Sequence, residues 1–393
     1  MRLNHLSYAI LLTALPTASL FAAGLDRSGQ SISAFLQPGN YAEAGISVLD
    51  PTVEGKATHS LGGEDLSDMG DDYYFPSAAI KVQASDKISL GLLYDQPFGA
   101  DATYGIDSGV FNQGSESTNV KVRTNNLTAL IGYQPTENWN FYAGPVWQTV
   151  EADIKLRGLA YQGLSGYNIK IAEEEAYGWL AGFAYSIPEI ALKASVTYRS
   201  EIKHKATGEE TYTLSSPMTV APGVTLPTGT TIGLADARVD AITPQSVNVD
   251  LQTGIAANTL AFANLRWVHW DQFAVTPQAL FQRSGGNNLI DYSDDQYSIT
   301  TGISRKFNDK WAGTAAVGYD SGAGNPITTL GPVEGNWNVG LGGQYSPAEN
   351  YLIQACVKYF WLGDATAQTG GNPVGEFEDN HALGYGLKIG YRF

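Results

Sequence analysis

The chain has 393 residues, of which 11% are aromatic, only 16% are charged and 44 are glycine. Its formal net charge of −16 would repel a nucleic-acid backbone, and so many aromatic residues exclude a disordered chain. The mean hydropathy of −0.15, with no apolar run of membrane-spanning length after residue 23, excludes a helical membrane protein and favours a large β-protein.

Residues 1–23 have the pattern of a secretory signal peptide, with Arg2 near the start, an apolar stretch, and then Ala22 and Ala23. An uncleaved N-terminal anchor is the alternative, but Pro16 breaks the apolar stretch and favours cleavage. Export permits disulfides, yet Cys356 is the single cysteine. We therefore expect the sheet and its packing alone to hold the mature chain together.

Residues 24–40 precede the first predicted strand, which spans residues 41–56, and they show no periodic pattern. If the strands that follow form a large β-barrel, side chains of its wall cannot fill the lumen by themselves. We therefore predict that this segment folds into the lumen as a hatch. Phe35 and Leu36 favour a hatch over a disordered tail, and they are candidates for the apolar wall of a ligand site.

Alternation of large apolar residues with small or polar residues marks the strands. The clearest runs are residues 88–94, 247–255, 311–319, 351–361 and 385–393. The polar face is mostly Gly, Ser, Asn, Gln and Thr, whereas a soluble sandwich would place Lys and Glu there. An apolar outer face and a mildly polar lumen are typical of a transmembrane β-barrel, which we assign to residues 41–393.

The third predicted strand, residues 88–98, includes Asp95 and Pro97 and runs into Gly99. Proline removes a ladder donor and glycine tolerates a bend, so these three residues are candidates for a kink and a lateral opening. The alternative is that Pro97 simply ends the strand at its outer loop.

Three cations fall on the predicted lumen face. Alternation places Arg199 and Lys203 opposite the apolar face that ends at Tyr198, and it places Arg266 opposite Trp267. Each cation is a candidate to receive a carboxylate head group. The alternative is that they pair with lumen acids such as Asp250 and only brace the barrel.

Six short polar turns alternate with seven longer loops, which predicts 14 antiparallel strands with both termini on the short-turn side. The turns lie near residues 85–87, 135–138, 188–189, 257–258, 308–310 and 346–350, and the loops near 56–72, 99–117, 158–170, 206–240, 271–293, 321–334 and 363–378. In bacterial outer-membrane barrels the short turns are periplasmic, so we expect both termini there.

Aromatic residues at the predicted strand ends fit two interfacial girdles. Trp139 and Trp311 lie beside short turns, whereas Trp267, Trp270 and the run 359–361 lie at the opposite strand ends.

Enzymatic and metal-binding functions find little support. No serine lies at a recognisable nucleophile spacing from any of the five histidines. The acid clusters at residues 71–72, 173–175 and 294–295 are more typical of solvated loops than of Ca²⁺ sites. We expect no catalytic residue, no metal and no cofactor.

Several segments resemble the FadL/TodX family of outer-membrane transporters for long-chain fatty acids and other hydrophobic compounds. They are AAGLDRSGQ (22–30), YRSEIKH (198–204), the run 243–273, RKFNDKWAGTAAVGYD (305–320) and the closing GLKIGYRF (386–393). The resemblance implies a monomeric 14-stranded barrel among outer-membrane lipid and lipopolysaccharide, with a hatch in the lumen. It also implies passive uptake, without direct energy coupling, and lateral release near the third strand. The terminal Phe393 resembles the signal that the barrel-assembly machinery reads.

Two features depart from the family pattern. Residues 36–40 read LQPGN where many members have Asn-Pro-Ala, and the loop at 158–170 is short. A polar-solute porin with an open lumen is the alternative function, and aromatic hydrocarbons are the alternative to fatty acids as cargo.

Overall fold

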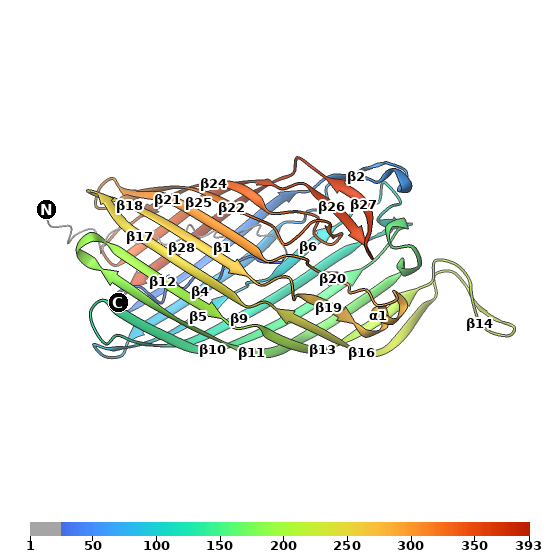
Figure 1. Cartoon of the computed structure of the whole chain (residues 1–393), viewed down its shortest axis with the longest axis horizontal. Helices are drawn as coiled ribbons and strands as arrows, with labels where there is room; N and C mark the ends of the chain where they lie inside the picture. The colour runs from blue at the N-terminus through green and yellow to red at the C-terminus, as the bar shows by residue number, and fades with distance from the viewer. Residues whose placement is uncertain (1–24) are drawn as a thin grey trace.

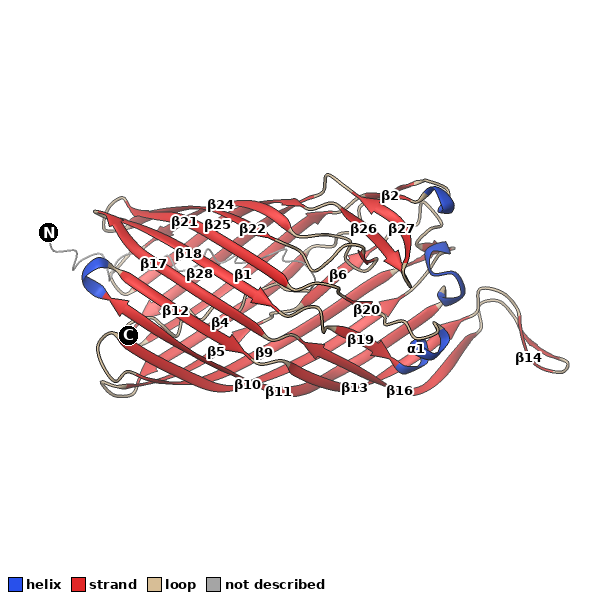
Figure 2. Cartoon of the chain, in the orientation of Figure 1, coloured by secondary structure: helices blue, strands red, loops and turns tan. Residues whose placement is uncertain are grey.

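The computed structural model describes residues 25–393, except for the side chains of residues 234–237. The predicted signal peptide, residues 1–23, lies outside the described residues. The described chain forms a long closed barrel that is almost entirely β-structure, with its few short helices at the two ends (Figures 1 and 2). No helix in this part of the chain is long and apolar enough to cross a membrane.

Nineteen strand segments make up the barrel sheet. They are β1 (Tyr41–Thr52), β4 (Tyr73–Gln83), β5 (Ile88–Asp95), β6 (Gly99–Thr103), β9 (Asn119–Tyr133), β10 (Trp139–Lys155), β11 (Tyr167–Ile187), β12 (Leu192–Arg199), β13 (Ile202–Thr213), β16 (Thr231–Thr243), β17 (Ser246–Ala256), β18 (Thr259–Val268), β19 (Ala274–Pro277), β20 (Ile290–Asp291), β21 (Gln296–Lys306), β22 (Trp311–Asp320), β24 (Asn336–Tyr345), β25 (Tyr351–Leu362) and β28 (His381–Arg392).

Five of the crossing strands consist of two segments each, namely β5 with β6, β12 with β13, β16 with β17, β18 with β19, and β20 with β21. The 19 segments therefore make 19 − 5 = 14 antiparallel strands. β1 pairs with β28 from Tyr41 opposite Arg392, which closes the ring. The predicted 14-stranded barrel is confirmed. Its first strand begins, and its last strand ends, at the short-turn end (Figure 1).

The long loops at the other end carry the smaller elements. These are β2 (Gly55–Ala57), β3 (Asp65–Leu66), β7 (Asn112–Gln113), β8 (Glu116–Ser117), β14 (Met218–Ala221), β15 (Val224–Leu226), β23 (Ile327–Thr328), β26 (Ala365–Thr369), β27 (Asn372–Phe377), α1 (Gln278–Arg283) and the 3-10 turns at His59–Leu61 and Leu159–Leu164. A third 3-10 turn, Pro188–Ile190, lies at the short-turn end. The β14–β15 hairpin projects furthest from the barrel (Figure 1).

The outer wall is apolar next to the short turns, and aromatic residues mark both edges of this band. Exposed rings beside the turns include Trp139, Trp311 and Tyr351, and those at the far edge include Trp179, Tyr297, Trp337 and Trp361. Beyond the far edge, exposed residues of β11 and β13 such as Lys170 and Glu209 are charged. An apolar band between two aromatic girdles is what a lipid-facing barrel requires, and the charged extension projects beyond it.

The lumen differs from the sequence expectation in its outer half. The interior there is a packed apolar cluster that includes Phe98, Tyr104, Phe111, Trp270 and Tyr292, rather than a lining of small polar groups. Trp270 and Phe360 belong to this cluster and are fully buried, so their assignment to the outer girdle was wrong. Strand alternation explains the error, because Trp270 and Phe360 lie on the face opposite half-buried Trp267 and exposed Trp361.

Candidate functional site

The third barrel strand is interrupted at the residues that the sequence singled out. β5 ends at Asp95 and β6 begins at Gly99, yet both segments pair with β9. The strand therefore resumes after Pro97, which rules out the alternative that Pro97 simply ends it. A Cβ at Gly99 would collide with the Tyr73 hydroxyl, which donates to the Val122 carbonyl at 3.2 Å, so this close approach requires glycine.

The interruption leaves a gap in the barrel wall. In β4, the residues from Ala78 to Gln83 pair with β5, whereas Tyr73–Ser77 pair only with β1. A cavity of about 90 Å³ lies at this gap. Its lining combines outward-facing Ile46 and Pro76 with inward-facing Phe75, Leu93 and Arg199. The cavity therefore reaches from the lumen to the lipid-facing surface.

Residues 25–40, here called the N-terminal segment, form hydrogen bonds with the interrupted strand. Arg27 N donates to the Pro97 carbonyl at 2.6 Å, and Gly99 N donates to the Leu25 carbonyl at 2.9 Å. The Ser28 hydroxyl donates to Asp95 Oδ2 at 2.5 Å. The N-terminal segment thus supplies bonds to the interrupted strand that a neighbouring strand would normally supply.

A buried ion pair ties the same segment to the opposite wall. Arg266 Nε lies 2.7 Å from Asp26 Oδ2, and both side chains are at most 1% exposed. The remaining guanidinium nitrogens donate to Asn248 and Gln30. Arg266 therefore pairs with an acid of the N-terminal segment, a partner that the sequence analysis did not identify.

Arg199 lies in the lumen, as alternation predicts. Its Nη2 donates to the Gln30 carbonyl at 2.8 Å, whereas its buried Nε has no hydrogen-bond partner in the described part of the chain. Arg199 also lines the cavity at the gap. The cavity lining is mixed, with Ile46 and Leu93 beside polar residues such as Glu43 and Asp95. A guanidinium with an N–H donor that lacks an acceptor can bind an anionic oxygen.

The lumen placement of Lys203 was wrong. Its side chain is 63% exposed on the outer wall and pairs with Glu201 at 2.9 Å. β12 ends at Arg199 and β13 begins at Ile202, and this break shifts the alternation by one residue. His204 consequently occupies the lumen face, where Nε2 meets Gln148 Oε1 at 2.9 Å.

Phe35 and Leu36 lie at different places in the lumen. Phe35 is fully buried and packs edge-on against Tyr142, with ring centroids 5.7 Å apart. It covers Gly91 and Gly132, where a Cβ would collide with its ring. Leu36 lines a second cavity of about 400 Å³ at the short-turn end. Phe35 therefore fixes the N-terminal segment in place, and neither residue lines the cavity at the gap.

A third cavity, of about 300 Å³, lies among the outer loops. Tyr161 and Leu164 of one 3-10 turn, Leu280 of α1, Leu289 and Leu330 provide its apolar lining. Glu210 of β13 holds α1 in place, because its carboxylate accepts hydrogen bonds from the backbone N–H groups of Ala279 and Leu280. Polar residues such as Asn287, Asp291 and Thr329 complete the lining. The outer surface thus offers a recess of mixed polarity that adjoins the packed cluster in the lumen.

Glu334 lies in the loop between β22 and β24, where the loops meet the barrel. Burial, with nearby Asp320 and Asp294, raises the pKa of its carboxyl group to about 7.

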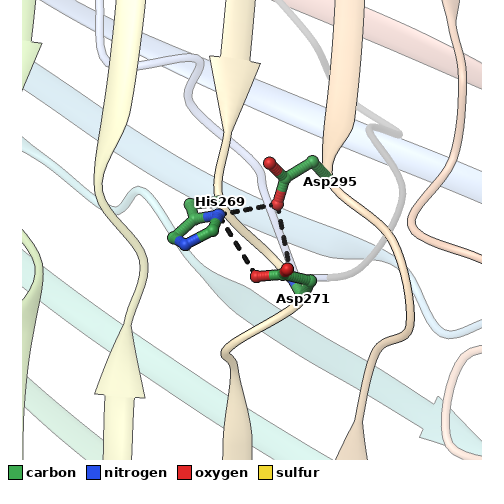
Figure 3. A group of neighbouring side chains, drawn as sticks. All are labelled: His269, Asp271 and Asp295. Atoms are coloured by element: carbon green, nitrogen blue, oxygen red, sulfur yellow. Dashed lines mark hydrogen bonds and ion pairs between the residues drawn. The ribbon is translucent and has the colours of Figure 1, made fainter.

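A cluster of three ionisable side chains lies on the outer wall. His269 Nδ1 lies 2.8 Å from Asp295 and 3.2 Å from Asp271 (Figure 3). These three side chains offer a set of metal-ligand atoms. However, both carboxylates already contact the His269 ring, and Trp267 Nε1 also donates to Asp295 at 2.8 Å. We interpret them as a cross-link between β18 and β21.

Residues 25–393 match the family described as "Outer membrane protein transport protein (OMPP1/FadL/TodX)". No curated protein matches in sequence. A FadL homologue from Pseudomonas aeruginosa has a similar structure, with a TM-score of 0.71 and 17% identity over 96% of each chain.

Two structures described as toluene transporters are also similar. TodX of Pseudomonas putida has a TM-score of 0.66 and 14% identity, covering 97% of this chain and 100% of its own. TbuX of Ralstonia pickettii has a TM-score of 0.60 and 13% identity, covering 98% and 99%. At these identities the structures show a shared fold, while the family match spans nearly the whole chain. The chain belongs to the OMPP1/FadL/TodX family of outer-membrane proteins that transport hydrophobic compounds.

Proposed function

We propose that the protein takes up long-chain fatty acids by passive diffusion and releases them sideways into the membrane through the gap at β5–β6. The observation that carries the proposal is the cavity at that gap, whose lining joins the lipid-facing surface to the lumen. Apolar cargo that leaves through the wall avoids the aqueous periplasm, where exposure of its chain would be unfavourable. We place both termini in the periplasm, because short turns are periplasmic in bacterial outer-membrane barrels.

The cargo enters through the recess among the outer loops and crosses the apolar cluster. The recess has a mixed lining of apolar and polar side chains, whereas the cluster is apolar. The N-terminal segment acts as the hatch below them, since it is buried in the lumen and bonded to the interrupted strand. Movement of this segment and widening of the gap are coupled, because the same hydrogen bonds hold both.

Arg199 favours an acidic lipid over a neutral hydrocarbon. Arg199 lines the cavity at the gap and has an unpartnered Nε, so its guanidinium can receive a carboxylate head group while Ile46, Phe75, Pro76 and Leu93 contact an alkyl chain. The acids Glu43 and Asp95 also line this cavity. Aromatic hydrocarbons remain the alternative cargo, since TodX and TbuX are described as toluene transporters.

Uptake of labelled oleate and labelled toluene distinguishes these cargoes. Cells that lack the protein are compared with cells that carry the wild type, Arg199→Gln or the matched control Lys203→Gln on the outer wall. We expect the wild type and the control to raise oleate uptake, and Arg199→Gln to lose most of that increase. Toluene uptake alone would support the hydrocarbon alternative, and equal uptake with and without the protein would refute transport of both.

A polar-solute porin requires an open lumen. The lumen here contains the N-terminal segment and, toward the loops, the apolar cluster. We therefore expect little steady conductance from the intact protein in planar bilayers, and a larger conductance after deletion of residues 24–40. A large steady conductance of the intact protein would favour the porin.

A further inference from the structure

The cavity at the short-turn end lies beneath the N-terminal segment. Residues 36–39 form its roof, and the turn-proximal ends of the strands form its walls. Its volume of about 400 Å³ is within the range of small-molecule sites. Part of the lining is apolar, and it consists of Leu36, Pro38, Pro188, Ala191, Leu192 and Leu260.

Two lysines of the lining converge on neighbouring carbonyls of the segment. Lys81 Nζ donates to the Gln37 carbonyl at 2.6 Å, and Lys193 Nζ donates to the Leu36 carbonyl at 2.8 Å. They come from β4 and β12, which are separated in the barrel by β5, β9, β10 and β11. The carbonyls end the helical turn that starts at Ile32, so the two ammonium groups cap that turn from opposite walls.

These two positive charges have no ion-pair partner among the described residues. Lys81 is only 3% exposed. An ammonium has three N–H donors, so a single carbonyl leaves two of them for another acceptor. The carboxylate of Asp250 is near enough to act on the charge of Lys193, and Lys81 and Lys193 repel each other. No acid in the part of the chain that the structure describes acts in this way on Lys81, whose buried charge makes the cavity receptive to an anion.

A third group of the lining also lacks a partner. Asn140 is 7% exposed, and its Oδ1 has no hydrogen bond within residues 25–393. This oxygen is an acceptor, so it suits an N–H or O–H group rather than a carboxylate. The acids of the lining, Asp86 and Glu137, are exposed residues of the short turns.

We propose that this cavity is a second ligand site, which binds a monocarboxylate with a short apolar chain from the short-turn side. The carboxylate accepts hydrogen bonds from Lys81 and Lys193, and the chain packs on the apolar lining. Because the carboxylate competes with the Leu36 and Gln37 carbonyls for the same ammonium groups, its binding loosens the end of the N-terminal segment. The site is separate from Arg199, and the inference does not depend on which compound crosses the barrel.

Hydrogen exchange of the peptide covering residues 32–40 tests the proposal, with the mature protein in lipid nanodiscs and hexanoate as the probe. We expect hexanoate to raise exchange saturably, by about tenfold, which corresponds to weakening one hydrogen bond to a charged group. Hexanol, which lacks the charge, has no such effect. No response of the wild type to hexanoate would overturn the proposal.

Variants separate this site from other effects of hexanoate. Lys81→Met with Lys193→Met abolishes the hexanoate response, whatever its effect on basal exchange, whereas Lys87→Met in an exposed turn of the same end retains it. The single variant Lys193→Met is the substitute if the double variant does not fold, and it weakens the response. Arg199→Gln retains the response even where oleate uptake is lost. A response that persists without both lysines would refute the assignment.

Discussion

The buried Asp26–Arg266 pair allows a quantitative test of how the N-terminal segment is held. Asp26→Asn preserves the shape of the side chain but leaves the guanidinium of Arg266 without a counter-charge in a site that is almost fully buried. Removal of one partner from a buried pair typically costs about 3–5 kcal/mol. Asparagine still accepts one hydrogen bond, so we expect the lower end of that range.

A cost of about 3 kcal/mol raises the population of the undocked segment by a factor on the order of 100, because each 1.4 kcal/mol is tenfold. Hydrogen exchange of the peptide covering residues 25–31 measures this population directly. Replacement of both partners, Asp26→Leu with Arg266→Met, should restore much of the protection, since it leaves no unpaired charge.

The matched control is Asp309→Asn, which removes an ion pair with Lys306 in an exposed turn. This pair is solvated, so we expect no change in exchange of the segment. Unchanged exchange in Asp26→Asn, in a barrel that remains folded, would refute the reasoning, and so would an equal increase in the control.

Four further outcomes are expected. Glu334 has a pKa raised to about 7, so its carboxyl group binds a proton more tightly in the folded loop than in the unfolded loop. The protonated carboxyl group therefore contributes fully to stability below about pH 4.5, and this contribution is lost as the pH rises through 7. Exchange of residues 321–335 from pH 5 to 8, corrected for intrinsic rates, should show this loss, and a pH dependence that persists in Glu334→Gln would contradict it. Glu210→Ala removes the carboxylate that binds Tyr167 and the start of α1. Limited proteolysis should then cleave residues 278–288 faster, by a factor that corresponds to about 2–3 kcal/mol. Cleavage at the wild-type rate would show that other contacts hold α1. Gly99→Val places a side chain against the Tyr73 hydroxyl and should reduce oleate uptake. Gly343→Ala adds a methyl group that meets no atom and should not reduce it. Equal uptake by the two variants would show that transport does not depend on the interruption at Gly99. EDTA should leave the Tm unchanged, because His269 already contacts both Asp271 and Asp295. A lowered Tm that Zn²⁺ restores would show a bound metal instead.

Local pattern was sufficient for most of the barrel. The alternation of short turns with long loops gave the strand number, which agrees with the structure. Within one unbroken strand, alternation assigns every side chain to a face, which is why the lumen positions of Arg199 and Arg266 agree as well. The same rule failed at Lys203, because the break after Arg199 inserts an odd shift that no local signal marks. The kink was foreseeable since Pro97 and Gly99 act on the backbone directly.

The sequence by itself therefore determined the antiparallel sheet, its apolar outer band and the place where its third strand is interrupted, because these follow from period-two alternation, from turn spacing and from backbone chemistry. Only the tertiary structure decided which distant groups meet. Asp26 meets Arg266 across 240 positions, and Lys81 and Lys193 reach the same turn from separate walls. Such contacts depend on the path of a non-periodic segment through the lumen, and that path is set by the sum of its contacts with many strands rather than by any pattern along the chain.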